Sequence, residues 1–380
     1  MSKAEYKRLG DYIREVNVRN RDLKVTKLVG LTIDKAFIPS VANVIGTDLS
    51  NYKVICHEQF ACSLMQVSRD GKMPIAMFKE DEAIMSPAYP MFEVIDKTVL
   101  MPQYLMMWFS RSEFDREASY YAVGGVRGSL TWEDFCNMKL PVPSITRQRE
   151  IVEEYETLSR RIRLNEQMIQ NLEDTAQALY RKMFVDGIDK ENLPEGWRME
   201  TVGDFCKEMK SGGTPSRSHN EYWDKKDYPW LKSGEVHNNI IVNIEEYISQ
   251  AGLDNSSAKI IPQGTVIMAM YGATAAQVAY LCCDAVTNQA CCNMICNSKE
   301  DAAYLFFHLL ANQEEIKKLA NGGAQENLSQ ELIAQQPMIN FNDKEIKSLF
   351  VPILNNLIVL YKENIKLTEL QSLLLAKMRQ

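Results

Sequence analysis

Five cysteines form the densest set of potential metal ligands in this chain. They are Cys282, Cys283, Cys291, Cys292 and Cys296. None belongs to a C-x-x-C pair, the spacing with which short loops usually hold zinc. Vicinal cysteines on alternating apolar runs are more often reduced core residues of a cytosolic protein. We therefore expect core packing here and no metal site.

The sequence also lacks the usual signatures of catalysis. It contains no G-x-x-x-x-G-K-[ST] phosphate loop, no H-E-x-x-H, no G-x-S-x-G and no N-P-P-Y or D-P-P-Y element. The four histidines, at positions 57, 219, 237 and 308, have no nucleophile and acid at motif spacing. We expect a chain without catalytic residues of its own.

One stretch concentrates small residues, hydroxyls and cations: "KSGGTPSRSHNEYWDKKDYPWLKSGEV", residues 210–236. Its glycines permit positive φ and close backbone approach, and its hydroxyls and basic groups are hydrogen-bond donors. It is either an ordinary surface turn or a loop that contacts a ligand. For the aromatic residues we favour core packing; these are Tyr222, Trp223, Tyr228 and Trp230.

The elements that must position these residues occur twice. "RLGDY" (8–12) matches "TVGDF" (201–205), "YLMMWF" (104–109) matches "YLFFHL" (304–309), and "GGVRGSLT" (124–131) matches "GGAQENLS" (322–329). All three pairs fall in order at offsets near 200. The chain therefore contains an internal repeat, with two similar halves.

Each half ends in a long amphipathic stretch with apolar residues at alternating spacings of three and four, which is typical of a coiled-coil seam. The first seam comprises Ile151, Tyr155, Leu158, Ile162, Asn165, Ile169, Leu172, Ala176, Leu179 and Met183. The second comprises Ile353, Leu357, Leu360, Asn364, Leu367, Gln371, Leu374 and Met378. A seam asparagine costs stability but disfavours wrong registers. Pro352 suits a first helical turn, so we expect the second helix to start near it.

Neither seam can remain in water, and mutual antiparallel burial is the simplest solution. The alternative is that each helix packs on its own globular part. We predict an α+β fold with a pseudo-two-fold repeat: globular domains at residues 1–145 and 191–341, and a coiled-coil spacer of two long antiparallel helices at 146–190 and 342–380. A rod of 33 residues at about 1.5 Å per residue is roughly 50 Å long.

Composition and targeting signals bound the class of protein. The N-terminus is charged and lacks an apolar h-region, so we expect a cytoplasmic location. The charge-free run 260–283 contains Pro262, Gly264 and Gln277, which fits two strands around a turn better than a membrane helix. Net charge is −7, with 18 basic and 18 acidic residues in 1–145 but 11 and 19 in 191–341.

These residues resemble a known family, the specificity subunits of type I restriction-modification systems. "SGGTPSRSHNEYW" with "YPWLKSGEV" resembles the opening of a target-recognition domain, and "YGATAAQVAYL", "VTNQA" and "GGAQENLSQE" resemble its later elements, in order. In the first half, "FIPSVANVIGTDLSNYKV", "MQVSRDGKMPIAMF", "SPAYPMFEV" and "VRGSLTWEDFCNMKLPVPSITRQREIV" resemble a different recognition-domain type. The resemblance covers essentially the whole chain.

The resemblance implies a non-catalytic subunit that binds double-stranded DNA. Each of two target-recognition domains would read one half of a bipartite, asymmetric site. Two adenine-N6 methyltransferase (modification) subunits and restriction/translocase subunits would be the partners. Those partners would use S-adenosylmethionine, ATP and Mg, and this chain would bind no cofactor itself.

Candidate DNA-binding residues in the second half follow from the loop chemistry and from the resemblance. Hydroxyls and cations can contact phosphates or base edges, and the glycines allow close approach. The loop supplies Lys210, Ser211, Gly212, Gly213, Thr214, Ser216, Arg217 and Lys232; the resemblance adds Tyr271, Thr274, Asn288 and Gln289. Ala276 and Gln277 stand where the family usually has a glycine and a basic residue, so we expect a weaker phosphate contact there.

In the first half, Arg19, Arg21 and Lys24 lie on a short asparagine-containing segment, for which a solvated charge run is an equal alternative. Arg127 in "GGVRG" corresponds to Gln325 in "GGAQEN", which also contains Asn327. Arginine suits guanine and glutamine suits adenine, so the two loops predict different half-site preferences.

Two other functions remain open, the first because this chain would look the same in either system. One is the recognition subunit of a related system whose methyltransferase and nuclease are fused in one partner. The other is a coiled-coil adaptor with two protein-binding heads and no nucleic acid, which the net charge of −8 in residues 191–341 would favour.

Overall fold

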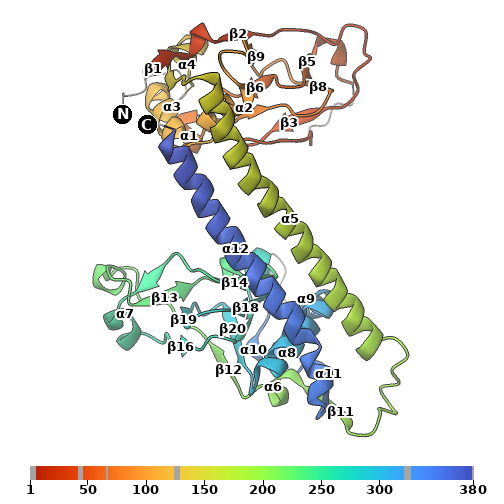
Figure 1. The fold of residues 1–380 in the computed structure, drawn as a ribbon. Helices are drawn as coiled ribbons and strands as arrows, with labels where there is room; N and C mark the ends of the chain where they lie inside the picture. Colours follow the sequence, from red (N-terminus) through yellow and green to blue (C-terminus); the bar gives the residue numbers. More distant parts are fainter. Residues whose placement is uncertain (1–5, 42–45, 66, 124–128, 321–326, 379–380) are drawn as a thin grey trace. The chain divides into compact units, whose positions relative to one another are not determined.

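The computed structural model of the chain describes residues 6–41, 46–65, 67–123, 129–320 and 327–378 (Figure 1). The chain divides into two compact units. Unit 1 is Met1–Ile162 with Leu367–Gln380, and unit 2 is Arg163–Lys366. The fold is mixed helix and strand, as predicted. No helix in the described ranges has both the length and the apolar run needed to span a membrane.

Unit 1 is built on a four-stranded sheet with strand order β2-β9-β6-β7 and three two-stranded pairs, β1-β10, β3-β4 and β5-β8. Its strands are β1 Tyr6–Arg8, β2 Ile13–Glu15, β3 Val29–Leu31, β4 Phe37–Pro39, β5 Lys53–Cys56, β6 Phe60–Cys62, β7 Ile75–Met77, β8 Glu82–Met85, β9 Met91–Val94 and β10 Lys139–Pro141. Its short helices are α1 Val67–Asp70, α2 Pro102–Phe109, α3 Ser112–Ala122 and α4 Trp132–Asn137.

The core of unit 1 is aromatic. Phe60 and Phe92 stack across β6 and β9 at 5.0 Å between ring centroids, and Phe109 of α2 meets both rings edge-on. All three are fully buried. Burying such rings removes a large apolar area from water, which is the main force that holds the helices on this sheet.

Unit 2 contains a five-stranded sheet, order β12-β20-β17-β18-β14, and a four-stranded sheet, order β15-β13-β19-β16. The strands are β11 Trp197–Thr201, β12 Glu208–Ser211, β13 Tyr228–Leu231, β14 Asn239–Ile241, β15 Tyr247–Ile248, β16 Ile260–Ile261, β17 Val266–Ala269, β18 Val278–Leu281, β19 Ala285–Thr287, β20 Cys291–Ile295 and β21 Pro337–Phe341. The helices are α6 Val202–Phe205, α7 Gln250–Asp254, α8 Lys299–Ala311, α9 Gln313–Lys318, α10 Gln330–Ala334 and α11 Lys344–Ser348.

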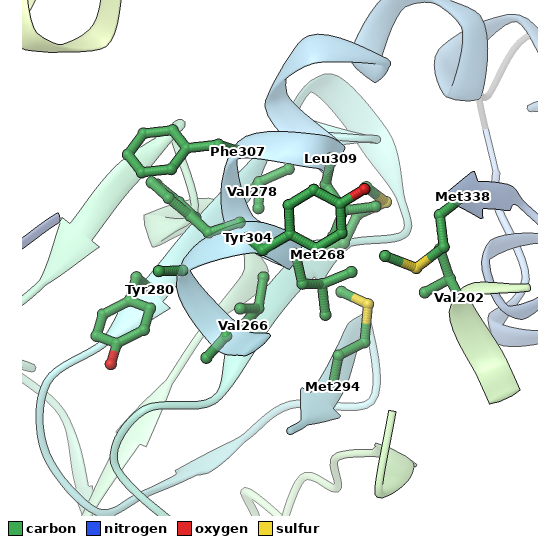
Figure 2. Packing of buried hydrophobic residues seen from close by; sticks show 14 of the residues in the cluster. Val202, Val266, Met268, Val278, Tyr280, Met294, Tyr304, Phe307, Leu309 and Met338 are labelled. Atoms are coloured by element: carbon green, nitrogen blue, oxygen red, sulfur yellow. The ribbon is translucent and has the colours of Figure 1, made fainter. Parts of the chain in front are cut away.

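One face of the five-stranded sheet packs against α8. Val266, Met268 and Val278 of the central strands meet Tyr304 and Phe307 of the helix in one buried cluster (Figure 2). α8 has eight consecutive buried residues, Ala302–Leu309, because the sheet covers one side and other apolar residues of the same cluster cover the rest.

Equivalent contacts in the two units show the internal repeat directly. Leu9 donates its backbone N–H to the carbonyl of Met138, and Val202 donates to that of Gln336. Thr131 and Ser329 each cap a helix, α4 and α10, by accepting a backbone N–H three residues on.

A tyrosine repeats in the same way. Tyr104 on α2 donates its hydroxyl hydrogen to the carbonyl of Pro141 on β10, at 3.2 Å. Tyr304 on α8 donates to the carbonyl of Ile339 on β21, at 2.6 Å. The two halves therefore share a framework: in unit 1 a tyrosine holds α2 onto β10, and in unit 2 a tyrosine holds α8 onto β21.

The two long helices are α5 Ile145–Phe184 and α12 Phe350–Lys377, and they pack antiparallel within each unit. In unit 2, Asn165 donates its side-chain amide to that of Asn364 at 2.8 Å, and the rings of Phe184 and Phe350 lie 6.3 Å apart. In unit 1, Gln371 donates to the hydroxyl of Ser159 at 2.7 Å. Low numbers on α5 thus meet high numbers on α12, and the shared seam excludes the alternative of helices that each pack only on their own domain.

The seam residues lie on the covered faces of both helices. Asn165, Ala176, Leu357, Leu360 and Met378 are buried, and the others are half-buried: Ile151, Tyr155, Leu158, Ile162, Ile169, Leu172, Leu179, Met183, Ile353, Asn364, Leu367, Gln371 and Leu374. α12 begins at Phe350, two residues before the predicted start. Pro352 still lies in the first turn, where its missing N–H has no intrahelical acceptor to lose.

Candidate nucleic-acid interface

The two glycines after β12 are required by packing. A Cβ on Gly212 would lie 2.1 Å from the carbonyl oxygen of Thr287, and one on Gly213 would lie 2.5 Å from the backbone nitrogen of Ala258. Both are buried and neither has positive φ, so of the two reasons predicted for them, only close approach applies. Buried Asn293 supports the same corner by donating its amide to the carbonyl of Lys210 and the hydroxyl of Thr287.

Arg217 and Lys232 converge on one carboxylate. Arg217 forms an ion pair with Glu246, and Lys232 approaches the other oxygen of Glu246 at 3.1 Å. The hydrogen bonds from Arg217 and then Lys232 hold the pKa of Glu246 below its ordinary value. Two cations facing one acid leave a net positive charge, with both cationic side chains about half exposed.

Arg217 is also held by aromatic rings. Its guanidinium lies 3.5 Å from the ring centroid of Trp223 and 4.9 Å from that of Trp230. Trp230 is buried and donates its indole N–H to the carbonyl of Gly213 at 3.0 Å. The aromatic residues therefore do more than fill the core, because they orient a cation at the surface.

A polar loop cluster brings together residues from four loops of unit 2; we use this name for Thr214, Ser233, Thr274, Asn288 and Gln289. Thr214 donates its hydroxyl to Gln289. Thr274 donates to the carbonyl of Ser233 at 3.1 Å, and Asn288 donates to the hydroxyl of Ser233 at 3.4 Å. Thr214 and Gln289 are exposed and the other three are half-buried, so the cluster presents amides and hydroxyls at the surface.

Strand register explains why these loops meet. β12 runs antiparallel to β20 and β17 runs antiparallel to both β20 and β18. The end of β12, the turn after β17 and the residues before β20 therefore share one end of the sheet. Tyr271, 44% exposed, lies at this end and forms an isolated bridge with Asn327.

Other predicted residues in unit 2 have local partners. Lys210 lies 2.9 Å from Glu208, Ser211 donates to Gln330 at 2.8 Å, and Ser216 pairs with the hydroxyl of Ser218. Gln325 lies outside the described residues. Arg217, Lys232 and the polar loop cluster are thus brought together, whereas Lys210 and Ser211 belong to the adjoining strand.

The turn after β17 accounts for the departure from the family pattern. Ala276 has φ of 67° and is fully buried, so it occupies a left-handed conformation in which glycine is the usual residue. Gln277 lies 3.3 Å from the ring nitrogen Nδ1 of His237. The backbone shape that the family glycine would serve is therefore retained with alanine.

In unit 1, the predicted cations lie on the loop between β2 and β3. Buried Asn20 pins this loop through two hydrogen bonds with Val25. Arg19 donates to the carbonyl of Asn51 at 2.6 Å, and Arg21 donates to its side-chain oxygen at 3.2 Å. These acceptors are neutral, so neither contact cancels the arginine charge.

The other two predicted cations of unit 1 are Lys24 and Arg127. Lys24 pairs with Asp22 at 2.8 Å, with its side chain 81% exposed. Arg127 lies outside the described residues, and its proposed difference from Gln325 stays a prediction. Arg19 and Arg21 are therefore brought together at Asn51, and Lys24 is already paired with an acid.

Sequence reasoning missed Ser233, Glu246 and Asn293. Ser233 lies inside the quoted "YPWLKSGEV", and its neighbour Lys232 had already drawn attention to that loop. Glu246 and Asn293 carry no local signal: of the groups they contact, Arg217 and the carbonyl of Lys210 lie 29 and 83 residues away. Only long-range pairing reveals them.

The five clustered cysteines lie in or beside the hydrophobic core. All are free thiols; Cys291 and Cys292 are fully buried and the others are half-buried. Burial raises the pKa of Cys291 to about 12 and that of Cys282 to about 11. A thiol must lose its proton to ligate a metal, so this environment disfavours ligation. No group of three potential ligands at metal-binding distance occurs among the residues described.

The chain is similar in sequence to proteins of known family. Residues 194–371 match the family described as the type I restriction modification DNA specificity domain. The specificity subunit of the type I restriction enzyme HindI from Haemophilus influenzae is 22% identical over 378 residues, covering 78% of this chain and 81% of that protein. The EcoR124I/EcoR124II specificity subunit from Escherichia coli is 30% identical over 67 residues, covering 18% and 16%.

The fold has a counterpart among solved structures. The crystal structure of the S subunit of a type I restriction-modification system from M. genitalium has a TM-score of 0.61 and 11% identity, across 100% of this chain and 97% of that chain. The predicted family is thus confirmed for residues 194–371, which match its DNA specificity domain, and the HindI specificity subunit aligns with most of the chain. The likeness to the solved S subunit is one of fold.

Proposed function

We propose that this chain recognises a bipartite, asymmetric DNA site, with one unit reading each half. The observation that carries the proposal is a shared framework with unlike loops. Tyr104 and Tyr304 make equivalent contacts, yet the candidate loops differ: unit 1 presents Arg19 and Arg21, and unit 2 presents the polar loop cluster beside Arg217 and Lys232. Unlike loops on like frames would read unlike sequences.

The partners and cofactors form the second part of the proposal. The chain would position two adenine-N6 methyltransferase subunits and the restriction/translocase subunits, with the paired helices setting the spacing of the half-sites. Those partner subunits would use S-adenosylmethionine, ATP and Mg, and the complex would work in the cytoplasm. Any extrusion of the target adenine would occur in the methyltransferase pocket.

Methylome sequencing tests the proposal. Cells that carry this chain with its neighbouring methyltransferase should show a split motif with adenine methylated in both halves. Exchanging residues 1–145 for the corresponding part of a relative should change one half of the motif and leave the other unchanged. A continuous motif, or an exchange that alters both halves, would contradict the division of labour.

The adaptor alternative predicts a different result. A protein-binding adaptor would leave the methylome unchanged when the chain is deleted. A fused methyltransferase-nuclease partner would give the split motif from a single additional polypeptide, so counting the polypeptides required for methylation distinguishes that system.

A further inference from the structure

A lysine cleft lies in unit 2, at the opposite end of the five-stranded sheet from the polar loop cluster. Its cavity has a volume of about 740 Å³. We define the cleft by Lys207, Lys299 and Lys362, which line it together with Tyr280 and Asn355. The walls come from residues 262–265 before β17, the ends of β18 and β20, the start of α8 and one face of α12.

The cleft carries three positive charges and no lining carboxylate. Lys299 donates to the neutral side-chain oxygen of Asn355 at 2.6 Å. Within the described chain, Lys207 and Lys362 form no ion pair. Such a concentration is unexpected in unit 2, because its residues 191–341, which supply Lys207 and Lys299, have a net charge of −8. Uncompensated like charges around a cavity favour an anionic ligand.

Two of these lysines, Lys299 and Lys362, both influence the pKa of the nearby thiol of Cys282. Burial raises the pKa of Cys282 to about 11, and Lys362 and Lys299 both oppose that rise. Cys282 itself lines the cleft. The positive charges are therefore close enough to act on the same atom.

Tyr280 supplies a hydrogen-bond donor. Its side chain is 5% exposed and belongs to the core cluster, but Figure 2 shows its hydroxyl directed away from the other labelled residues of the cluster. This hydroxyl has no hydrogen bond to any residue that the structure describes. Burial raises the pKa of Tyr280 to about 12, so the group remains protonated near neutral pH. Because Tyr280 lines the cleft, this protonated hydroxyl can donate a hydrogen bond to a ligand there.

Strand register separates this cleft from the polar loop cluster. Val266 pairs with Tyr280 and with Met294 at the cleft end, whereas Ala269 pairs with Cys291 at the loop end. Three residues of extended strand span about 10 Å. The cleft is therefore a separate site within unit 2.

We propose that the lysine cleft binds a multivalent phosphate anion of the size of a nucleoside diphosphate or triphosphate. Lysine ammonium groups bind phosphate as point charges, whereas planar carboxylates are usually paired with arginine. Three charges match a multivalent anion better than a single carboxylate. The volume lies within the range for small-ligand pockets, and Leu281, Ile358 and Val359 provide an apolar wall for a base. This site is additional to the proposed DNA recognition and does not depend on it.

Calorimetric titration of the full chain with pyrophosphate, ADP and ATP, without added metal, tests the proposal. The variant Lys207→Gln/Lys299→Gln/Lys362→Gln should bind pyrophosphate at least about tenfold more weakly. The control Lys225→Gln/Lys259→Gln/Lys344→Gln has the same change of net charge at exposed positions outside the cleft. It should change the affinity by less than about twofold.

Tyr280→Phe keeps the ring in the core and removes the donor. We expect about fivefold weaker pyrophosphate binding with an unchanged melting midpoint in the absence of ligand. Equal losses in the cleft and control variants, or no anion binding by the wild-type chain, would overturn the proposal. A last outcome is that the cleft variant, compared with the control variant, binds a non-specific DNA duplex more weakly but binds the free phosphate compounds equally well. The cleft would then bind the phosphates of a DNA backbone, and the proposal of a free phosphate ligand would be wrong.

Discussion

At the scale of single residues, Glu246 limits the charge that unit 2 can offer to DNA. It neutralises one of two cations, Arg217 and Lys232. Replacing Glu246 by glutamine should free one positive charge, whereas Lys232→Gln should remove one. In the assembled complex, we expect DNA affinity to rise about three- to tenfold in the first variant and to fall by a similar factor in the second.

Salt dependence distinguishes this effect from a general loss of structure. The slope of log affinity against log salt should become steeper by about 1 for Glu246→Gln and shallower by about 1 for Lys232→Gln. Changes of the same sign in both variants would show that Glu246 acts by positioning Arg217 and not by charge.

Gly212 is a residue whose side chain is excluded by its surroundings. A Cβ there would lie 2.1 Å from the backbone carbonyl of Thr287, which cannot move without disturbing β19. We expect Gly212→Ala to lower the free energy of unfolding by about 3 kcal/mol or more. Gly234→Ala is the matched control, because no atom lies within 4 Å of its added Cβ, and it should stay within about 0.5 kcal/mol. Chemical denaturation measures both; equal effects would refute the packing argument.

His308 makes unit 2 sensitive to acid. Burial lowers its pKa from 6.5 to about 4, and its ring nitrogen Nδ1 lies 2.6 Å from the hydroxyl of Tyr180 on α5. Because the folded-state pKa lies below the unfolded value, the unfolded chain takes up the proton first as pH falls. The stabilisation is therefore complete above about pH 6.5 and is lost progressively as pH falls toward 4.

Between pH 7 and pH 5, this single group should account for about 2 kcal/mol of lost stability. Denaturation of the wild-type chain and of His308→Gln at both pH values measures the difference. The variant should be less stable at pH 7 but should lose about 2 kcal/mol less on acidification. An unchanged pH dependence would exclude His308 as the responsible group.

At the scale of elements, the paired asparagines define the register of the long helices. Asn165 and Asn364 hydrogen-bond to each other and lie 199 positions apart, close to the offsets of the framework pairs Tyr104/Tyr304 and Thr131/Ser329. Equivalent residues meet in this way when two helices are related by a pseudo-two-fold axis. In this register the Asn165 amide nitrogen has an acceptor, whereas its buried oxygen has no partner among the described residues. The predicted role of a seam asparagine, which disfavours registers without the amide–amide hydrogen bond, therefore rests on this one bond.

Leucine substitutions test this role. Asn165→Leu alone leaves one amide opposite an apolar side chain and should cost about 1 to 3 kcal/mol. Asn165→Leu/Asn364→Leu should recover most of that loss or exceed the wild-type stability, as apolar replacements of buried polar pairs often do. A double-mutant cycle by denaturation gives the coupling energy. Strictly additive losses would show that the two amides do not depend on each other.

At the scale of the whole molecule, charge limits what the chain can bind alone. Net charge is −7, and Arg217, Lys232, Lys210 and Lys24 each contact a carboxylate. We expect the isolated chain to bind DNA weakly and with strong salt dependence, because partner subunits would supply much of the phosphate-neutralising charge. Site-specific binding at nanomolar concentration without partners would contradict this expectation.

The amino-acid sequence alone revealed the repeat, both helical seams, the family resemblance and the position of the glycine loop. These features depend on local spacing or on similarity between segments, so they survive without coordinates. The start of α12 was misplaced by two residues because a proline fits anywhere in the first turn. The glycines were explained in part by positive φ, although buried neighbours were the cause.

Only the tertiary structure decided which groups are available. Glu246 takes up Arg217 and Lys232, Asn293 holds the glycine corner, and three lysines separated by up to 155 positions meet around one cavity. Sequence spacing cannot encode such contacts, because strand order and register bring distant residues together. The sequence by itself therefore determined the kind of protein, and the packing of its strands and helices determined which charges remain free to bind.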